Sequence, residues 1–169
     1  MRILAVDQSY TSCGIIILEY KDDSDQYEIV HLERYVTNAE TDMFARAWEV
    51  KQRITELALT NNVDYTALEG LAFAMTGNAT RDLAGLQFVI VTALRYVEKQ
   101  GVLVIPPNTV KKIATGKGNA KKEEMYEKLP QEVKDKLEEA KLKKTTGRYD
   151  LTDAYWIARS AIEAKKTRT

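Results

Sequence analysis

Apolar and polar positions along the first 36 residues alternate in the manner of three successive β-strands. An apolar run from residue 3 to residue 6 stops at Asp7, and after a polar link a second apolar run covers residues 14–18. Residues 27–36 then alternate with a period of two, which is typical of a strand exposed on one side. Three consecutive strands with short links predict an antiparallel meander, in which Asp7 lies at the end of an inner strand.

The rest of the chain shows helical periods interrupted by two further short apolar runs. The first helix is expected to begin at Thr41 or Asp42, either of which can cap it, and to end near residue 60. The strand that follows, residues 65–70, ends near a carboxylate, Glu69, as the first strand does. The remaining predicted elements are a helix over 80–100, a strand over 102–105, and helices over 108–115, 130–144 and 150–165.

This order of elements predicts an α/β fold with a mixed five-stranded sheet, three antiparallel strands and then two parallel ones, flanked by helices. A right-handed crossover allows the fourth strand to lie beside the first and parallel to it. Asp7 and Glu69 would then stand side by side at the sheet edge where open α/β sheets bind ligands. An aspartate at a strand end is also a common turn residue, so Asp7 alone does not decide between the two interpretations.

The last predicted helix supplies two more carboxylates. Asp150 and Asp153 are three residues apart, so both can lie on one face of its first turn. Aspartate near a helix N-terminus is ordinary capping chemistry, and that interpretation stays open for each residue alone. If all four carboxylates converge, they form an all-oxygen site suited to Mg²⁺ or Mn²⁺. Two such ions roughly 4 Å apart would suit phosphodiester hydrolysis.

The formal net charge is zero, but the charge is unevenly distributed. Residues 1–40 carry eight acidic and three basic side chains, whereas residues 109–148 carry twelve basic and seven acidic ones. Two stretches of the basic half, 111–122 and 141–148, contain no acidic residue. A lysine-rich surface is most often simply solvated, and a footprint for nucleic-acid phosphates is the functional alternative.

Composition narrows the class of protein further. With 169 residues and 44% apolar content, the chain can form one domain with a substantial core. No stretch reaches the roughly 20 apolar residues of a membrane span and no signal peptide is evident, so we expect a cytoplasmic protein. Cys13 is the only cysteine, which excludes an intrachain disulfide. His31 falls within the third predicted strand, away from other metal-ligand types, and is interpreted as a strand side chain.

Four segments, taken in order, are similar to the RuvC-type Holliday-junction resolvases of the RNase H-like superfamily, in a phage-encoded branch. They are residues 3–7 with Gly14, residues 67–69, residues 110–122 and residues 150–154. Each motif is short, but their order and approximate spacing extend over most of the chain. The resemblance implies a single RNase H-like nuclease domain over residues 1–169.

The resemblance also implies an activity and a set of site residues. The expected activity is that of a homodimer that makes two nicks in opposed strands of a four-way DNA junction, with two Mg²⁺ ions per site that Mn²⁺ can replace. Asp7, Glu69, Asp150 and Asp153 correspond to the family's metal-binding tetrad. Basic residues close to the scissile phosphate match Lys111 and Lys122. The other expected DNA contacts are Lys112, Lys117, Lys121, Phe73 and Arg81.

The second subunit is expected to meet the helix over 80–100, whose middle is apolar nearly all round. Three features depart from the family pattern. Gln8 and Ser9 follow the first aspartate where the family has Pro-Gly. Ala72 stands where an aromatic wedge is expected, with Phe73 next to it. The lysine-rich segment at about 126–148 is interpreted as a helical insertion that lies on the surface or projects from it.

Other functions remain open at the level of sequence. The chain could be a noncatalytic, structure-selective DNA-binding dimer in which the basic half carries the function. It could also be a less selective RNase H-like nuclease that acts on flaps, forks or RNA–DNA hybrids. An actin-like nucleotide-binding protein is disfavoured, because the chain is short for that duplicated architecture and lacks a second glycine-rich phosphate loop.

Overall fold

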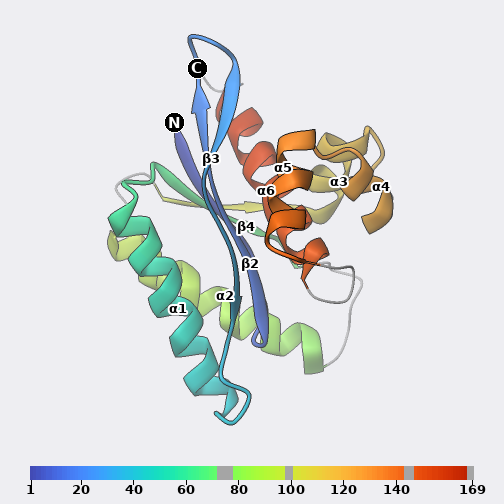
Figure 1. Ribbon diagram of the computed structural model, residues 1–169. Helices are drawn as coiled ribbons and strands as arrows, with labels where there is room; N and C mark the ends of the chain where they lie inside the picture. The colour runs from blue at the N-terminus through green and yellow to red at the C-terminus, as the bar shows by residue number, and fades with distance from the viewer. Residues whose placement is uncertain (72–77, 98–100, 143–146, 167–169) are drawn as a thin grey trace.

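A five-stranded sheet lies at the centre of the molecule (Figure 1). The structure is a computed structural model that describes residues 1–71, 78–97, 101–142 and 147–166. The strands are β1 (Arg2–Asp7), β2 (Ser12–Lys21), β3 (Gln26–Val36), β4 (Tyr65–Glu69) and β5 (Val102–Ile105), in the spatial order β3-β2-β1-β4-β5. The first three strands are antiparallel, β4 runs parallel to β1, and β5 runs parallel to β4. The predicted mixed sheet is therefore confirmed.

Helices cover both faces of the sheet, as Figure 1 shows. One face carries α1 (Met43–Thr60) and α2 (Asn78–Val97). The other carries the remaining helices, which are α3 (Pro107–Thr115), α4 (Lys122–Glu127), α5 (Gln131–Glu139) and α6 (Arg148–Lys166). In the described parts of the chain, no helix combines the length and the apolar character that a membrane crossing requires.

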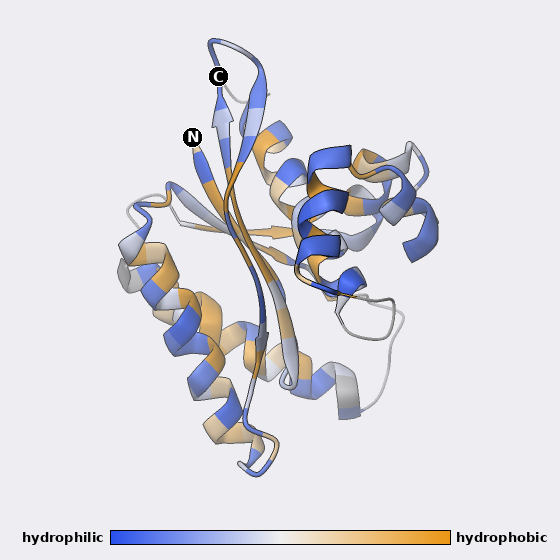
Figure 2. Cartoon of the chain, in the orientation of Figure 1, coloured by the Kyte–Doolittle hydropathy of each residue, from blue (hydrophilic) through white to orange (hydrophobic). Residues whose placement is uncertain are grey.

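The strand β1 is buried on both sides because its residues alternate between two cores. Ile3 and Ala5 belong to the core under α6, and Leu4 and Val6 belong to the core under α1 and α2. This double burial explains why β1 reads as an uninterrupted apolar run instead of an alternating one. Figure 2 shows the central strands as hydrophobic and the edge strand β3 as largely hydrophilic.

Helix starts follow local chemistry. The Asp42 side chain accepts a 2.8 Å hydrogen bond from the backbone N–H of Ala45, so Asp42 caps α1 as predicted. Helix α3 begins at Pro107 with Pro106 as its N-cap, earlier than the predicted caps Asn108 or Thr109, because the fixed φ of proline suits the first helical position and its missing N–H costs nothing there. Gly116 ends α3 with a φ of +81°, a left-handed conformation that favours glycine.

The lysine-rich segment is anchored to the core. Helix α5 lies on the surface with a hydrophilic outer face (Figure 2), but Val133 and Leu137 on its inner face are 3% and 0% exposed. Both side chains join the core under α6. The sequence left two arrangements open for this segment, on the surface or projecting from the protein. The prediction that it projects is therefore wrong.

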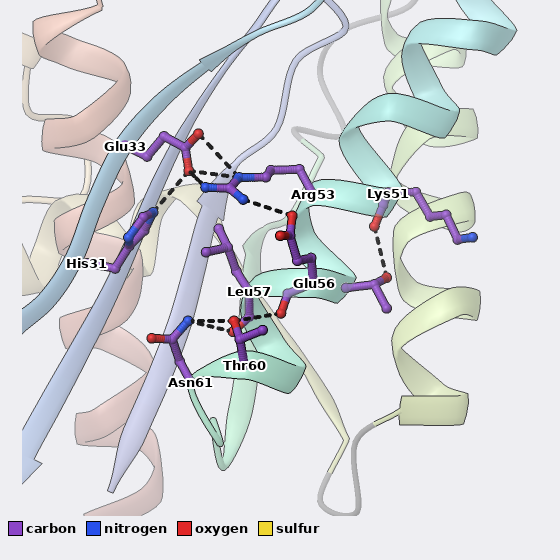
Figure 3. A network of polar contacts seen from close by, with 9 residues as sticks. His31, Glu33, Lys51, Arg53, Glu56, Leu57, Thr60 and Asn61 are labelled. Carbon is purple, nitrogen blue, oxygen red and sulfur yellow. Dashed lines mark hydrogen bonds and ion pairs between the residues drawn. The ribbon is translucent and has the colours of Figure 1, made fainter.

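A polar network holds α1 against the edge strand β3 (Figure 3). The Arg53 guanidinium of α1 donates to both carboxylate oxygens of Glu33 in β3 and also to Glu56, at distances of 2.8–3.3 Å. His31 lies in β3, as predicted, with its Nε2 at 2.9 Å from Glu33. The network links α1 to the edge strand β3 through side chains.

Candidate active site

Asp7 and Glu69 lie side by side at the carboxyl ends of two parallel strands. The β1–β4 register pairs Val6 with Leu68, so the next residue of each strand stands at the same edge. Each carboxylate is two residues beyond an alanine of the core under α6, Ala5 or Ala67, and therefore faces α6. Both side chains are partly buried. The predicted pairing of these two strand ends is confirmed as geometry.

The first turn of α6 brings Asp150 and Asp153 to the same edge. Asp153 is only 7% exposed. Asp150 comes close because Gly14, the register partner of Asp7 in β2, has no side chain. A Cβ atom at Gly14 would overlap the backbone carbonyl of Asp150. The absent side chain is thus what allows the start of α6 to lie against the sheet beside Asp7.

Two residues that the sequence did not single out hold the Asp150 carboxylate. The Ser12 hydroxyl donates a 3.1 Å hydrogen bond to its Oδ2, and Nε of Arg34 lies 3.7 Å from the same oxygen. Arg34 is the register partner of Gly14 in β3, so Asp7, Gly14 and Arg34 form one row across three strands. Only the register between β2 and β3 could have identified Arg34, and that register depends on the length of the hairpin.

Asp7, Glu69 and Asp153 have raised pKa values. Burial raises the pKa of Asp7 well above its usual range, and the Asp153, Glu69 and Asp150 carboxylates add to the effect. Burial also raises the pKa of Glu69 to about 7, again with a contribution from Asp153. Burial raises the pKa of Asp153, although the ammonium of Lys122 partly offsets the effect. Carboxylates that burial and mutual repulsion disfavour in this way are stabilised by a bound cation.

Asp7, Glu69 and Asp153 line a cleft of about 680 Å³. Of the predicted site residues, the cleft is lined by Asp7, Glu69, Asp153, Lys111, Lys121 and Lys122. Lys122 donates a 2.7 Å hydrogen bond to Oδ2 of Asp153. The aromatic ring of Tyr149 and the amide of Gln8, neither predicted as a site residue, also line the cleft. One concave surface therefore brings carboxylates and lysines together.

The other predicted residues lie elsewhere. Asp150 does not line the cleft. Lys112 and Lys117 are exposed on α3 and on the turn after it, outside the cleft lining. The Arg81 side chain is 76% exposed on α2, with its Nε 3.9 Å from Asp82. Phe73 lies outside the described residues.

The donor chemistry of the cleft fits a hard cation. All the candidate ligands are carboxylates, which suit Mg²⁺ or Mn²⁺ and not a thiolate-seeking metal. Within the described ranges, no three histidine, cysteine, aspartate or glutamate side chains are already arranged to coordinate an ion. Lys122 is bound to Asp153. The residues present are therefore of the right type for a hard cation.

A mixed sheet with carboxylates at the adjoining ends of its first and fourth strands defines an RNase H-like nuclease fold. The family model described as crossover junction endodeoxyribonuclease RuvC matches residues 3–158. The chain therefore belongs to the RuvC family, and it is an endonuclease that cleaves crossover junctions in DNA. No curated protein matches the chain in sequence.

Solved structures agree with the fold. The Thermus thermophilus RuvC structure is 20% identical in sequence with a TM-score of 0.76, over 99% of this chain and 97% of that one. A yeast mitochondrial Holliday junction resolvase is 16% identical with a TM-score of 0.69, over 99% and 81%. A fowlpox virus resolvase, solved with substrate Holliday junction DNA, is 16% identical with a TM-score of 0.62, over 98% and 99%. At these identities the likeness establishes the shared fold.

Proposed function

We propose that this chain nicks four-way DNA junctions by hydrolysing a phosphodiester in the cleft that Asp7, Glu69 and Asp153 line, with Asp150 completing the acidic set. The observation that carries the proposal is the meeting of these carboxylates, from three separate segments, beside Lys111 and Lys122. An acidic group of this kind needs a cation, and a cation flanked by lysines suits an anionic phosphate.

The cofactor of this reaction is a divalent ion, Mg²⁺ with Mn²⁺ as a substitute, and we assign two ions to each site. When bound, such ions activate a water molecule and stabilise the leaving oxygen in an in-line displacement. Asp7 and Glu69 would hold the ions from the rigid strand ends, and Asp153 would hold them from α6. Ser12 and Arg34 fix the orientation of Asp150 behind them. Lys111 and Lys122 place positive charge where the scissile phosphate must lie.

The DNA extends from the cleft over the basic surface around α3. Lys121 lies at the cleft, and Lys112 and Lys117 are exposed beyond it, so a phosphate backbone leaving the cleft can follow them. Contacts of this type are independent of base sequence and weaken with rising salt. Arg81, exposed on α2 at the other side of the cleft, is a further contact for an arm of the junction.

The cleavage experiment uses synthetic DNA substrates. Wild-type protein, Asp7→Asn and a matched control, Asp23→Asn in the exposed β2–β3 turn, are incubated with a labelled four-way junction and Mg²⁺. We expect paired nicks with the wild type and the control, and retained junction binding without nicking for Asp7→Asn. If the wild type binds the junction but never nicks it, the protein is a noncatalytic DNA-binding module. Equal cleavage of forks, flaps or RNA–DNA hybrids would make it a less selective nuclease.

We also propose that the active form is a homodimer that meets through α2. Two opposed strands must be cut, and a two-fold dimer presents two identical clefts to them. On α2, Ile90 is fully buried in the core, while Phe88 and Val89 are 73% and 37% exposed. A large exposed aromatic residue on an apolar helix is typical of an interface.

The dimer experiment measures the molecular mass by sedimentation over a range of concentrations. We expect Phe88→Glu to give monomers that bind one junction arm weakly and no longer make paired nicks. The matched control is Phe44→Glu on α1, where the side chain is 78% exposed. The proposal that the dimer meets through α2 would be contradicted if Phe88→Glu remained a dimer. It would also be contradicted if both variants dissociated to the same extent.

A further inference from the structure

The helix that carries Lys122 depends on tertiary contacts for its position. Helix α4 has six residues, and Lys121 at its N-cap makes no capping hydrogen bond with its side chain. Helices this short are not stable on their own in water. The side chain of Met125, on the inner face of α4, is 2% exposed and belongs to the core under α6. The place of Lys122 beside the cleft is therefore set by how α4 packs against α6.

The indole of Trp156 makes a buried hydrogen bond from α6 to α4. Its Nε1 donates to the backbone carbonyl of Met125 at 3.0 Å, and the Trp156 residue is only 6% exposed. The N–H of Leu129 would reach this carbonyl if α4 continued, but it donates to the carbonyl of Tyr126 instead. Trp156 thus satisfies a carbonyl of the kind that a helix leaves open at its end.

This bond runs parallel to the ion pair between the same two helices. Lys122 of α4 donates to Asp153 of α6 at 2.7 Å, and three residues further along each helix Met125 meets Trp156. The two contacts are therefore about one turn apart on both helices. The second contact joins a neutral donor to a backbone carbonyl, so a cation in the cleft would not compete for it. Helix α4 would stay attached to α6 even when the Lys122 ammonium left Asp153.

We infer that Trp156 is a positioning residue of the cleft, whose indole N–H holds α4 against α6 and so keeps Lys122 beside Asp153 and the scissile phosphate. Trp156 does not line the cleft, so it acts through Lys122 and not by touching DNA. The inference rests on the role that the proposed function gives to Lys122.

The test uses two variants that remove the donor at position 156. Trp156→Phe keeps a buried aromatic ring without an N–H. A second variant carries benzothienylalanine at this position, which has the size of tryptophan and lacks the N–H, so it separates loss of the bond from loss of volume. The control is Tyr155→Phe, which removes a buried hydroxyl from the neighbouring residue of α6. That hydroxyl accepts a hydrogen bond from Arg159 and not from α4.

The first measurement is amide hydrogen exchange over residues 122–127, without metal or DNA. Both variants at position 156 should exchange faster there than the wild type, because α4 opens more readily once its bond to α6 is lost. Tyr155→Phe should exchange as the wild type does. Wild-type protection of α4 in the benzothienylalanine variant would overturn the inference.

The second measurement is the rate of nicking at a saturating concentration of four-way junction, with the protein in excess over DNA. We expect both variants at position 156 to nick about 10-fold more slowly with little change in junction affinity, since a small displacement of a reacting group is costly. In a Lys122→Met background the same substitutions should have no further effect, because the group that they displace is already gone. Tyr155→Phe should nick at the wild-type rate.

Two kinetic results would overturn the positioning role. One is a wild-type nicking rate in the benzothienylalanine variant, and the other is the same fold loss with and without Lys122, which would indicate a purely structural bond. Failure of the proposed function looks different. In that case the wild type does not nick, or Lys122→Met nicks at the wild-type rate.

Discussion

The Lys122 ammonium lies 2.7 Å from Oδ2 of Asp153, so it occupies a carboxylate that the proposed metal site would use. The Asp153 side chain is only 10% exposed, whereas the Lys122 side chain is 54% exposed. If the proposed site binds a divalent ion, that ion would compete with Lys122 for Asp153, and the displaced ammonium would be available to the scissile phosphate.

Replacing Lys122 with methionine separates its effect on folding stability from its proposed role at the scissile phosphate. Without divalent ions, Lys122→Met should unfold more easily by about 1–3 kcal/mol, because a buried carboxylate loses its charged partner. Mn²⁺ should stabilise the variant more than the wild type, since the ion no longer displaces a lysine, while junction nicking falls. Thermal unfolding with and without Mn²⁺ measures this, with the exposed neighbour Lys121→Met as control. A smaller Mn²⁺ effect in Lys122→Met would show that the lysine helps the metal to bind.

The raised pKa of Glu69 makes stability depend on pH when no divalent ion is present. Its pKa is about 7 in the folded protein, against an ordinary value of 4.5 for glutamate, so the folded state binds more protons between these two values. Stability must then fall as the pH rises through this window and level off above about 7. Asp7, whose pKa is also raised by burial, adds to the same trend.

The measurement is the thermal midpoint in EDTA between pH 5 and pH 8.5. Glu69→Gln should flatten the decline and raise the midpoint at pH 8, because the amide cannot ionise. Glu124→Gln, an exposed glutamate of α4, should leave the curve as in the wild type. A wild-type midpoint that rises steadily from pH 5 to pH 8 would contradict the burial of these carboxylates, and excess Mg²⁺ should reduce the decline by neutralising them.

Much of the fold and half of the acidic set could be predicted from local patterns. An apolar run that stops at Asp7, and a second that stops at Glu69, each mark a strand end, and the crossover rule brings the two together. The side chain of Asp42 likewise marks the start of α1. These features depend on residues that are close together in the sequence, so the sequence alone predicts them.

Contacts that depend on register could not be read from the sequence. Ser12 and Arg34 meet Asp150 only because β2 and β3 pair in one particular alignment, and no local pattern fixes that alignment. The burial of Val133 and Leu137 was hidden in the same way, because the many charged residues of α5 outweigh two apolar ones in any average over the helix. The sequence distinguished Gln8 only because the family has proline at this position.

The packing of α5 against the core can be tested by making the same leucine-to-alanine substitution at a buried and at an exposed position. Leu137 is fully buried and Leu59 on α1 is 58% exposed. Leu137→Ala should lower the free energy of unfolding by about 2–5 kcal/mol through lost burial and the cavity left behind. Leu59→Ala should cost less than about 0.5 kcal/mol. Urea unfolding measures both, and equal small effects would mean that the lysine-rich helix is detached from the core in solution.

Gly14 is the position where the sheet and the acidic end of α6 come closest. A methyl group there would overlap the backbone carbonyl of Asp150, and backbone cannot rotate away as a side chain can. Gly14→Ala should therefore cost more than about 3 kcal/mol or push α6 away from β2, which would separate Asp150 from Ser12 and Asp7. The control is Gly118→Ala, whose added Cβ would meet Asn108 at an ordinary 3.5 Å. Urea unfolding and Mn²⁺ binding together distinguish the outcomes: near-wild-type values for Gly14→Ala in both would show that the start of α6 does not depend on this close approach.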